Sequence, residues 1–458
     1  MMTELPWHWR PVPLQERKAS QIFAQLFGGD QIATLLESPY PTPLDYPYLA
    51  RYSICAGPPR RIAGQLRLWT PPIGSIFPQL KQFLCHPHIH PSTPSHLPFQ
   101  GGWLGWLGYD AAWEIETLPY QKTDQLPFPV AYWYEPENFA VLDHQEQILW
   151  LATTHPQDGD RLIEQLNYVS HSTQNHPPSE HIDSPKISAP LVFETQQSQY
   201  EAMVLRAKEY IRQGDIFQAN LSLRFHTQIT ADSWQVYQRL QQINPSPFAS
   251  YWRSPWGEVV SCSPERLVQL TGKQAQTRPI AGTRPRGMSP QEEARLCHEL
   301  RSNLKERAEH IMLVDLERND LGRVCVWGTV QVDELLAIER YSHVIHLVSN
   351  VSGTLQPEQD GVDLLRALFP GGTITGCPKV RCLEIIEELE PVRRSLFYGS
   401  CGYLDQRGNL DLNILIRTLL FTDNQVIGQV GAGIVADSEP TQEWQESLQK
   451  AKAQWSAL

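Results

Sequence analysis

LNILIRTLLF (412–421) and QVIGQVGAGIV (425–435) are two strand-like segments with only three residues between them. A shorter strand-like segment, CGYL (401–404), precedes them, and a final helix is expected to begin near Pro440. Strands that follow strands, with helices in separate runs, are typical of an α+β fold. The sequence therefore predicts antiparallel sheets rather than a wound parallel sheet.

Earlier segments extend this pattern toward the N-terminus. SQYEAMVLRAKEYIRQGD (198–215) carries apolar residues at helical spacing, and IFQANLSLRF (216–225) has the composition of a strand. Ser289 begins a capping box, which predicts a helix that runs past Glu309. VCVWGTVQV (324–332) is again strand-like.

The composition divides the chain at a polar stretch with four prolines, residues 171–190. Such a stretch is the best linker candidate in the sequence. We therefore predict a sheet-rich N-terminal region (1–170), a linker (171–190) and a C-terminal region (191–458) that holds most of the motifs.

The overall composition excludes several classes of protein. The 458 residues carry a net charge of −12 without a compensating basic tract, which argues against nucleic-acid binding. Neither a GxGxxG sequence nor a Walker loop is present, so nucleotide binding is disfavoured. The eight cysteines form no CxxC pair, and no apolar run approaches the roughly 20 residues that cross a bilayer. These features predict a cytoplasmic protein with free thiols and no membrane segment.

Two pairs of glutamates could form a metal site. Glu306 and Glu309 share one face of a predicted helix, and Glu443 and Glu446 share a face of the last helix, near Lys450. Oxygen ligands without His or Cys suit Mg²⁺, which could hold an anionic substrate in this acidic protein. The alternative is that these are solvated surface glutamates.

Other residues could contact an anion directly. Gly431 and Gly433 would let backbone N–H groups approach a carboxylate. Arg417 lies in an apolar strand, where a charge needs a partner, although an internal ion pair would also satisfy it. His346 could carry a proton, or could be a hydrogen-bonded core histidine.

These segments, in this order, resemble the chorismate-binding enzymes, which include anthranilate, aminodeoxychorismate, isochorismate and salicylate synthases. The resemblance runs from about LLES (35–38) to the last helix and is densest after Gly214. It implies a large α/β sandwich of stacked antiparallel sheets with helices outside, built as one intertwined unit. The predicted C-terminal region would be the catalytic part, and the N-terminal region would resemble that of anthranilate synthase component I.

The resemblance also implies roles for individual residues. Glu309 and Glu446 would ligate Mg²⁺, with Glu306 and Glu443 acting through its waters. His346 would lie near the departing ring hydroxyl as a general acid, and Gln218 and Thr283 would complete the catalytic set. The substrate-contacting positions would be Gly282, Thr283, Thr375, Tyr403, Arg417, Gly431, Ala432, Gly433 and Lys450, with Arg417 and Tyr403 holding the enolpyruvyl carboxylate.

The nucleophile and the product follow from further comparison with the family. Gln218 stands where isochorismate and salicylate synthases carry a lysine that activates water, so ammonia is favoured. Four segments resemble aminodeoxychorismate synthase: FQANLSLRF (217–225), NPSPFASYW (244–252), SCSPERL (261–267) and FPGGTITGCPK (369–379).

RPIAGTRPRG (278–287) instead resembles anthranilate synthase, because Ala281 replaces a lysine that is frequent in aminodeoxychorismate synthases. The sequence thus favours synthesis of 4-amino-4-deoxychorismate for p-aminobenzoate and folate. Synthesis of anthranilate for tryptophan is the alternative. An inactive regulatory binding module is a third.

Two binding partners are also implied. The sequence has no glutaminase motif, so a separate glutamine amidotransferase subunit should supply ammonia in a heterodimer. Glu37 and Ser38, together with Pro247 and Phe248, match the tryptophan pocket of anthranilate synthase. The alternative is that these four residues belong to the core and to a turn.

Overall fold

The computed structural model describes residues 7–39, 47–84, 93–172, 189–340, 344–423 and 425–458. Most of the predicted linker, residues 173–188, lies outside the described residues. The strands form two large antiparallel sheets, which confirms the α+β prediction.

The first sheet contains 12 of the described strands. Apolar residues alternate along its long central strands, so that one face meets the second sheet and the other meets helices. In spatial order its strands are β1 (His8–Pro13), β10 (Ile148–Thr153), β9 (Asn138–Asp143), β3 (Tyr52–Ala56), β2 (Ala33–Glu37), β13 (Phe248–Ser254), β14 (Gly257–Ser263), β23 (Thr418–Thr422), β24 (Gln425–Ile434), β12 (Gln218–Gln228) and β11 (Val192–Phe193), with β20 (Gly376–Cys377) on β12.

The second sheet contains ten of the described strands, and a separate hairpin joins β4 (Arg61–Ile62) to β5 (Gln65–Leu66). The order in the sheet is β17 (Ile280–Pro285), β19 (Val344–Thr354), β16 (Gln274–Arg278), β15 (Arg266–Thr271), β22 (Leu410–Asn413), β21 (Ser400–Asp405), β7 (Gly102–Leu107), β8 (Ala131–Tyr134) and β6 (Leu68–Trp69), with β18 (Gln331–Arg340) on β19.

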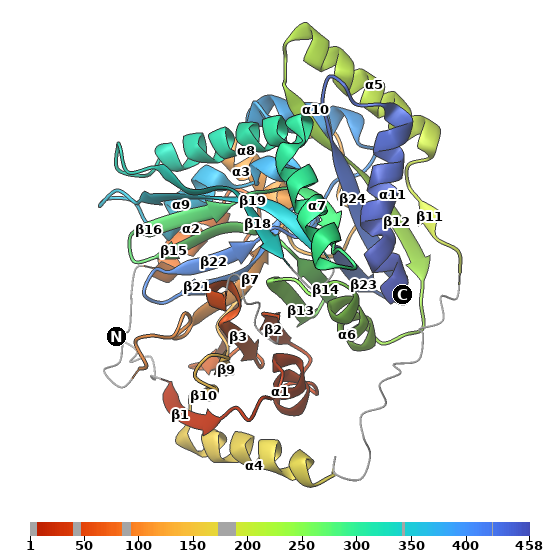
Figure 1. The fold of residues 1–458 in the computed structure, drawn as a ribbon. Helices are drawn as coiled ribbons and strands as arrows, with labels where there is room; N and C mark the ends of the chain where they lie inside the picture. Colours follow the sequence, from red (N-terminus) through yellow and green to blue (C-terminus); the bar gives the residue numbers. More distant parts are fainter. Residues whose placement is uncertain (1–6, 40–46, 85–92, 173–188, 341–343, 424) are drawn as a thin grey trace.

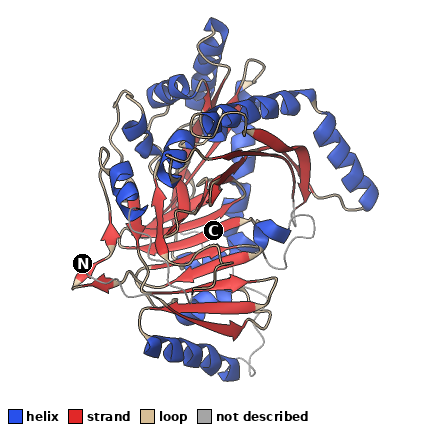
Figure 2. Cartoon of the chain, turned by 90° about the vertical axis from the view of Figure 1, so that its left-hand side faces the viewer, coloured by secondary structure: helices blue, strands red, loops and turns tan. Residues whose placement is uncertain are grey.

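Helices cover the outside of this sandwich, as Figures 1 and 2 show. α11 packs on β24 between α5 and α6, while α8 and α9 pack on the second sheet. The helices are α1 (Ala19–Leu26), α2 (Ile76–Leu84), α3 (Ala112–Ile115), α4 (Pro156–Ser172), α5 (Gln197–Gln213), α6 (Ser233–Ile243), α7 (Pro290–Ser302), α8 (Leu304–Gly322), α9 (Gly361–Leu368), α10 (Lys379–Leu389) and α11 (Pro440–Ala457), with short 3₁₀ turns η1 (Pro47–Ala50), η2 (Tyr109–Ala111) and η4 (Gly372–Ile374).

Three predicted elements differ from the structure. The segment 412–421 is not one strand, because the chain leaves β22 in the second sheet and enters β23 in the first. Arg417 stands at this crossing with a left-handed φ of 50°, which interrupts the extended backbone. The helix predicted from Ser289 is divided at Asn303, whose side chain caps α8. The segment 324–332 is mostly turn, and β18 begins only at Gln331.

Both sheets interleave strands from the two sides of the predicted linker. In the first sheet β2 pairs with β13, and in the second β7 pairs with β21. One apolar core lies between the sheets, and another lies between the first sheet and the helices α1, α5, α6 and α11. The described residues therefore form one intertwined unit.

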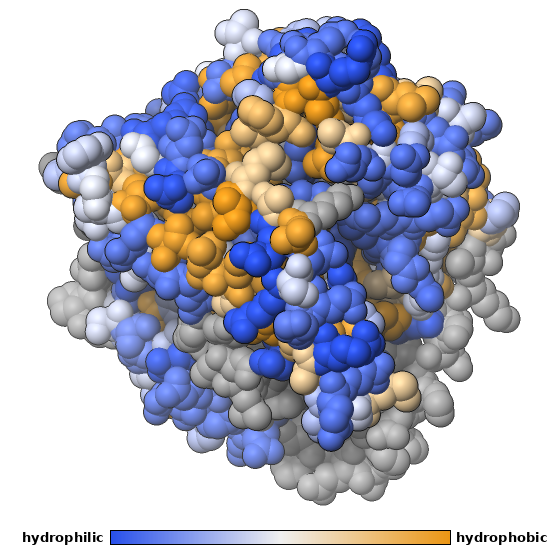
Figure 3. Space-filling model, turned by 45° about the horizontal axis from the view of Figure 1, so that its top comes forward, coloured by the Kyte–Doolittle hydropathy of each residue, from blue (hydrophilic) through white to orange (hydrophobic). Residues whose placement is uncertain are grey.

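The outer surface is mixed in character. Figure 3 shows a face on which hydrophilic side chains predominate and apolar side chains gather in a broad patch. Of the helices that the structure describes, none has the length and apolar character needed to cross a membrane.

Candidate active site

Thr283 and His346 meet where β17 and β19 pair. The two residues are register partners, and Oγ1 of Thr283 lies 3.0 Å from Nδ1 of His346. His346 is only 1% exposed, and burial lowers its pKa to about 3, with the nearby charge of Arg417 lowering it further. The ring is therefore neutral near pH 7. It can form hydrogen bonds, and its role as a general acid stays a prediction.

Gly282 brings the backbone of β17 against the start of α8. Its φ is 66°, and a Cβ atom there would lie 2.7 Å from Leu300 and 3.0 Å from Oε2 of Glu306. Arg284 reinforces this contact, because its Nη1 donates to Oε1 of Glu306 at 2.8 Å. The first turn of α8 is thus fixed beside the strand that carries Thr283.

Arg417 projects from the crossing between the two sheets. Its Nη1 donates to Oδ1 of Asn244 at 2.7 Å, and burial lowers the pKa of its guanidinium. The charge also acts on Glu265 and on His346, whose pKa values it lowers. Arg417 is therefore a partly buried cation at the point where both sheets contribute to the site.

The glycines of β24 lie against polar side chains of β12, as the register requires. A Cβ atom at Gly433 would lie 2.6 Å from Nε2 of Gln218, and one at Gly431 would lie 3.0 Å from Oδ1 of Asn220. Glycine is required at Gly431, where a Cβ atom would also lie 2.5 Å from the backbone carbonyl oxygen of Leu221, whereas the end of the Gln218 side chain could move away from one at Gly433. Ala432, between them, packs its side chain into the core on the opposite face.

Lys450 and Thr375 border this strand end from two other elements. The Nζ of Lys450 donates to the carbonyl of Gly431 at 3.2 Å and pairs with Glu446 at 2.8 Å. Thr375 is fully buried, and its hydroxyl donates to the carbonyl of Gly371, so that hydroxyl is already engaged in the fold.

Glu265 is a functional candidate that the sequence interpretation missed. It directly precedes β15, and burial raises the pKa of its carboxyl to about 8. The backbone N–H of Ile280, next to Ala281, donates to its Oε1 at 3.5 Å. In the sequence, the segment SCSPERL indicated only a resemblance to a family, and Glu265 itself was assigned no role. Its burial depends on elements that are far apart in sequence.

Several buried polar atoms around these elements lack a hydrogen-bond partner within the described part of the chain. Buried polar atoms are usually paired, so such a group is typical of a site that a ligand completes. The atoms are Oε1 of Gln218, Oδ1 of Asn220, Oε2 of Glu306, Oε2 of Glu317 and the hydroxyl oxygen of Tyr398.

The four glutamates of the predicted metal site lie on α8 and α11. Glu306 is paired with Arg284 and Glu446 with Lys450, while Glu443 is buried. Among the residues that the structure describes, no three His, Cys, Asp or Glu side chains are arranged to hold a metal ion.

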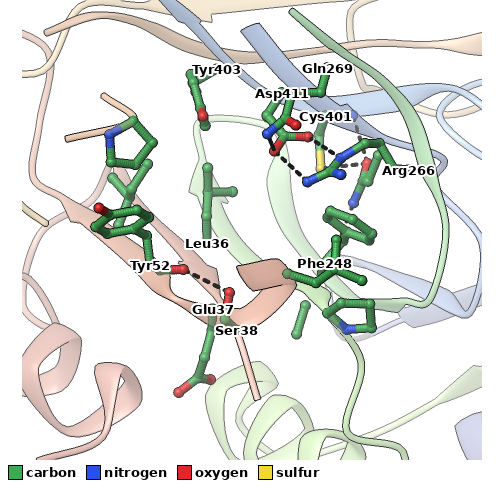
Figure 4. Close-up of a pocket in the computed structure, with 17 residues that line it drawn as sticks. Leu36, Glu37, Ser38, Tyr52, Phe248, Arg266, Gln269, Cys401, Tyr403 and Asp411 are labelled. Atoms are coloured by element: carbon green, nitrogen blue, oxygen red, sulfur yellow. Dashed lines mark hydrogen bonds and ion pairs between the residues drawn. The ribbon is translucent and has the colours of Figure 1, made fainter. Parts of the chain in front are cut away.

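A pocket separate from these contacts lies between β2, β13 and the second sheet (Figure 4). It contains about 690 Å³ of empty space, part of which is open solvent. Glu37, Ser38, Pro247 and Phe248 all line it, so the four residues matched from the sequence are brought together.

The Glu37 carboxylate is nevertheless used by the fold. It points away from Tyr403 and Arg266 in Figure 4 and accepts hydrogen bonds from the backbone of Ser20 and the hydroxyl of Tyr237. The polar wall of the pocket instead contains Arg266 and Asp411, which form a bidentate pair with both distances at 2.9 Å.

Tyr403 lines this pocket too, whereas Arg417 is not among the described residues around it. The sequence predicted that both would hold one carboxylate. The structure places Tyr403, on β21, beside Phe248 in this pocket, and Arg417 beside Asn244. That the two hold one carboxylate stays a prediction.

The fold agrees with the comparisons to known proteins. A family model described as chorismate binding enzyme matches residues 39–456. The chain belongs to the chorismate-binding enzyme family.

Individual relatives extend this finding. An anthranilate synthase component I-like protein of a Synechocystis species is 66% identical over 468 residues, covering 100% of this chain and 93% of the relative. Aminodeoxychorismate synthase component 1 of Bacillus subtilis is 45% identical over 364 residues, covering 79% and 77%. The crystal structure of anthranilate synthase component I from Streptococcus pneumoniae matches with a TM-score of 0.75 and 33% identity, covering 88% of this chain and 92% of that one.

Proposed function

We propose that this protein is the synthase component that aminates chorismate, with 4-amino-4-deoxychorismate as its product. The observation that carries the proposal is the meeting of Arg417, Glu265 and the Thr283–His346 pair at the junction of the two sheets. A cation, a carboxyl group that keeps its proton at neutral pH and a neutral imidazole suit a carboxylated substrate that must lose a hydroxyl group.

Each group has a distinct task in this proposal. Arg417 pairs with a substrate carboxylate, and the N–H groups near Gly431 and Gly433 approach it from the strand end. Glu265 donates its proton to the departing ring hydroxyl, which leaves as water. His346 holds a hydrogen bond at the same ring position.

Magnesium fits this site by the chemistry of its donors. Glu309 and Glu446 would bind the ion, and Glu306 and Glu443 would bind its waters, since hard carboxylate oxygens are what Mg²⁺ prefers. Oε2 of Glu306 is buried without a hydrogen-bond partner in the described ranges, as expected of a group that acts on an absent species. The ion would neutralise the ring carboxylate of chorismate, which a protein of net charge −12 otherwise repels.

The product and the nucleophile rest on smaller observations. Gln218 offers an amide where a lysine would be needed to activate water, which favours ammonia. Four segments that resemble aminodeoxychorismate synthase favour amination to 4-amino-4-deoxychorismate. Anthranilate synthesis is the second candidate, because Ala281 cannot form a covalent bond to the ring and the 66% identical relative is named as anthranilate synthase-like.

The surrounding biology follows from this activity. We propose that a glutamine amidotransferase subunit supplies the ammonia, that the product serves p-aminobenzoate and folate synthesis, and that the protein is cytoplasmic. High ammonium should replace the partner in vitro.

One assay tests the proposal. The purified chain is incubated with chorismate, Mg²⁺ and an ammonium salt, with and without aminodeoxychorismate lyase. We expect p-aminobenzoate only when the lyase is added. Fluorescent anthranilate without the lyase would establish the second candidate instead, and no consumption of chorismate would indicate the inactive binding module.

A further inference from the structure

A second acidic cluster lies behind Glu265. Glu317 and Asp320 are both 3% exposed on the inner side of α8, and Lys379 begins α10 beside them. The Nζ of Lys379 donates to Oδ2 of Asp320 at 2.5 Å and to the carbonyl of Leu368 at 2.9 Å. The cluster thus holds two buried carboxyl groups, and the lysine donates its hydrogen bond to Asp320 rather than to Glu317.

Glu317 and Glu265 meet at the same 3₁₀ turn, η4. The backbone of Gly372 hydrogen-bonds to Glu317, and the side chain of Thr373 interacts with Glu265. Gly372 lies so close that a Cβ atom there would be 3.2 Å from Oε1 of Glu317. The two carboxyl groups therefore lie against neighbouring residues of one short turn.

Burial and the neighbouring carboxyl groups favour a proton on this pair, whereas the nearby cations and the hydrogen bonds of the turn oppose it. Glu265 faces Glu317 from α8 and Arg417 from the crossing before β23. Glu317 faces Asp320 and Lys379, and Asp320 also faces Arg323. Burial raises the pKa of Glu317, and the neighbouring Asp320 raises it further. In turn, the charge of Glu317 raises the pKa of Glu265.

We propose that Glu317, which lies behind Glu265 at the shared η4 turn, is a positioning residue whose buried negative charge keeps Glu265 in its protonated form. This inference rests on the proposed function, in which Glu265 gives its proton to the leaving hydroxyl. As the ring carbon–oxygen bond breaks, the oxygen leaves as water and Glu265 becomes a carboxylate. Ammonia forms the new carbon–nitrogen bond, and the proton that this nitrogen then loses restores the acid.

The test replaces Glu317 by glutamine, which removes the charge and keeps the size and an acceptor oxygen. Infrared spectroscopy follows the protonated carboxyl band of Glu265, assigned by its loss in Glu265→Gln, as the pH is raised. We expect the midpoint of this titration to fall by about one pH unit in Glu317→Gln. The basic limb of kcat/KM at fixed free ammonia should move with it, which lowers turnover about tenfold above the midpoint.

A matched control lies on the same helix. Asp315→Asn alters an exposed carboxylate of α8 that pairs with Arg318, and it should leave the midpoint unchanged. An unshifted midpoint in Glu317→Gln, or an equal shift in Asp315→Asn, would overturn the inference.

A second variant and a readout that is independent of turnover complete the test. Should the glutamine variant fail to fold, Glu317→Met has similar length and no polar atom to leave unpaired, and the same shift is expected of it. The infrared titration needs no turnover. It therefore tests Glu317 even if the ammonium assay shows no consumption of chorismate, the result that rejects the proposed function.

Discussion

Glu265 makes the stability of the protein depend on pH. Burial raises its pKa to about 8 in the folded chain, from an ordinary value of 4.5. The folded state thus holds this proton more tightly than the unfolded state. The contribution of Glu265 to the free energy of unfolding is complete below about pH 4.5 and falls by about 1.4 kcal/mol per pH unit until about pH 8.

Glu265→Gln removes this dependence. We expect the variant to gain stability relative to the natural protein as the pH rises from 5 to 8, because glutamine has no proton to lose. Urea unfolding at each pH measures the difference in unfolding free energy. A difference that stays constant over this range would contradict the assigned environment of Glu265.

At the level of single residues, the sequence could name chemical types but not environments. His346 and Arg417 were recognisable as functional candidates from their apolar surroundings, and the structure places both Glu265 and His346 near Arg417. The neutral state of His346 and the retained proton of Glu265 depend on burial by distant elements. Sequence spacing cannot report this desolvation.

Among the elements, α8 and α11 carry the proposed metal ligands. Glu309→Gln or Glu446→Gln removes one charged oxygen ligand while leaving each helix intact. We expect Mg²⁺-dependent turnover to fall by about 100-fold or more, since even supporting residues of metal sites cost 10- to 100-fold in affinity or activity.

Turnover as a function of Mg²⁺ concentration provides the measurement, with circular dichroism as the check on folding. Asp315→Asn, on the exposed side of α8, serves as the matched control and should behave like the natural protein. Full activity of both glutamate variants would remove the proposed metal site.

The pocket between β2 and β13 gives a prediction for tryptophan. If the pocket binds this amino acid, L-tryptophan should raise the melting temperature, because a ligand that binds only the folded state stabilises it. Phe248→Ala removes one wall and the ring beneath Arg266, whose guanidinium carbon lies 5.0 Å from its centroid. The shift should then be much smaller.

Differential scanning fluorimetry measures the shift across a tryptophan series. Tyr120→Ala, at a side chain outside the residues that line this pocket, should retain the full shift. No shift in the natural protein would favour the alternative that these residues only build the core and a turn.

The helices and strands also show which elements could be predicted from sequence periodicity and which could not. The long strand 425–435 and the last helix from Pro440 were predictable, because each has an uninterrupted period. The division of 412–421 at Arg417 was not, because both halves are apolar and only the backbone conformation of one residue separates the sheets. For the same reason, Asn303 could end one helix and cap the next within a continuous helical pattern.

At the scale of the whole molecule, the two predicted regions cannot be independent folding units. Central strands such as β2 and β7 come from the N-terminal region and pair with β13 and β21. A fragment of residues 191–458 would lose these partners and expose apolar core. We expect it to show no cooperative thermal unfolding by calorimetry, unlike the full chain. A sharp transition in the fragment would show that the region folds alone.

The family resemblance predicted this intertwining, whereas composition alone suggested two regions and a linker. Composition reports local polarity, and a polar stretch on the surface is compatible with either arrangement. Which strands pair is decided by contacts between residues hundreds of positions apart, which no local signal records.

The placement of β7 beside β21 has a consequence for synthesis on the ribosome. Residues 102–107 emerge early, yet the strand that covers one of their edges ends at Asp405. Until nearly the whole chain has been translated, the edge of β7, which bears Trp103 and Trp106, lacks the strand β21 that pairs with it. Unpaired strand edges of this kind can pair with other nascent chains. Productive folding is therefore deferred to the end of translation, and the yield in a cell should depend on chaperones that shield this edge during elongation.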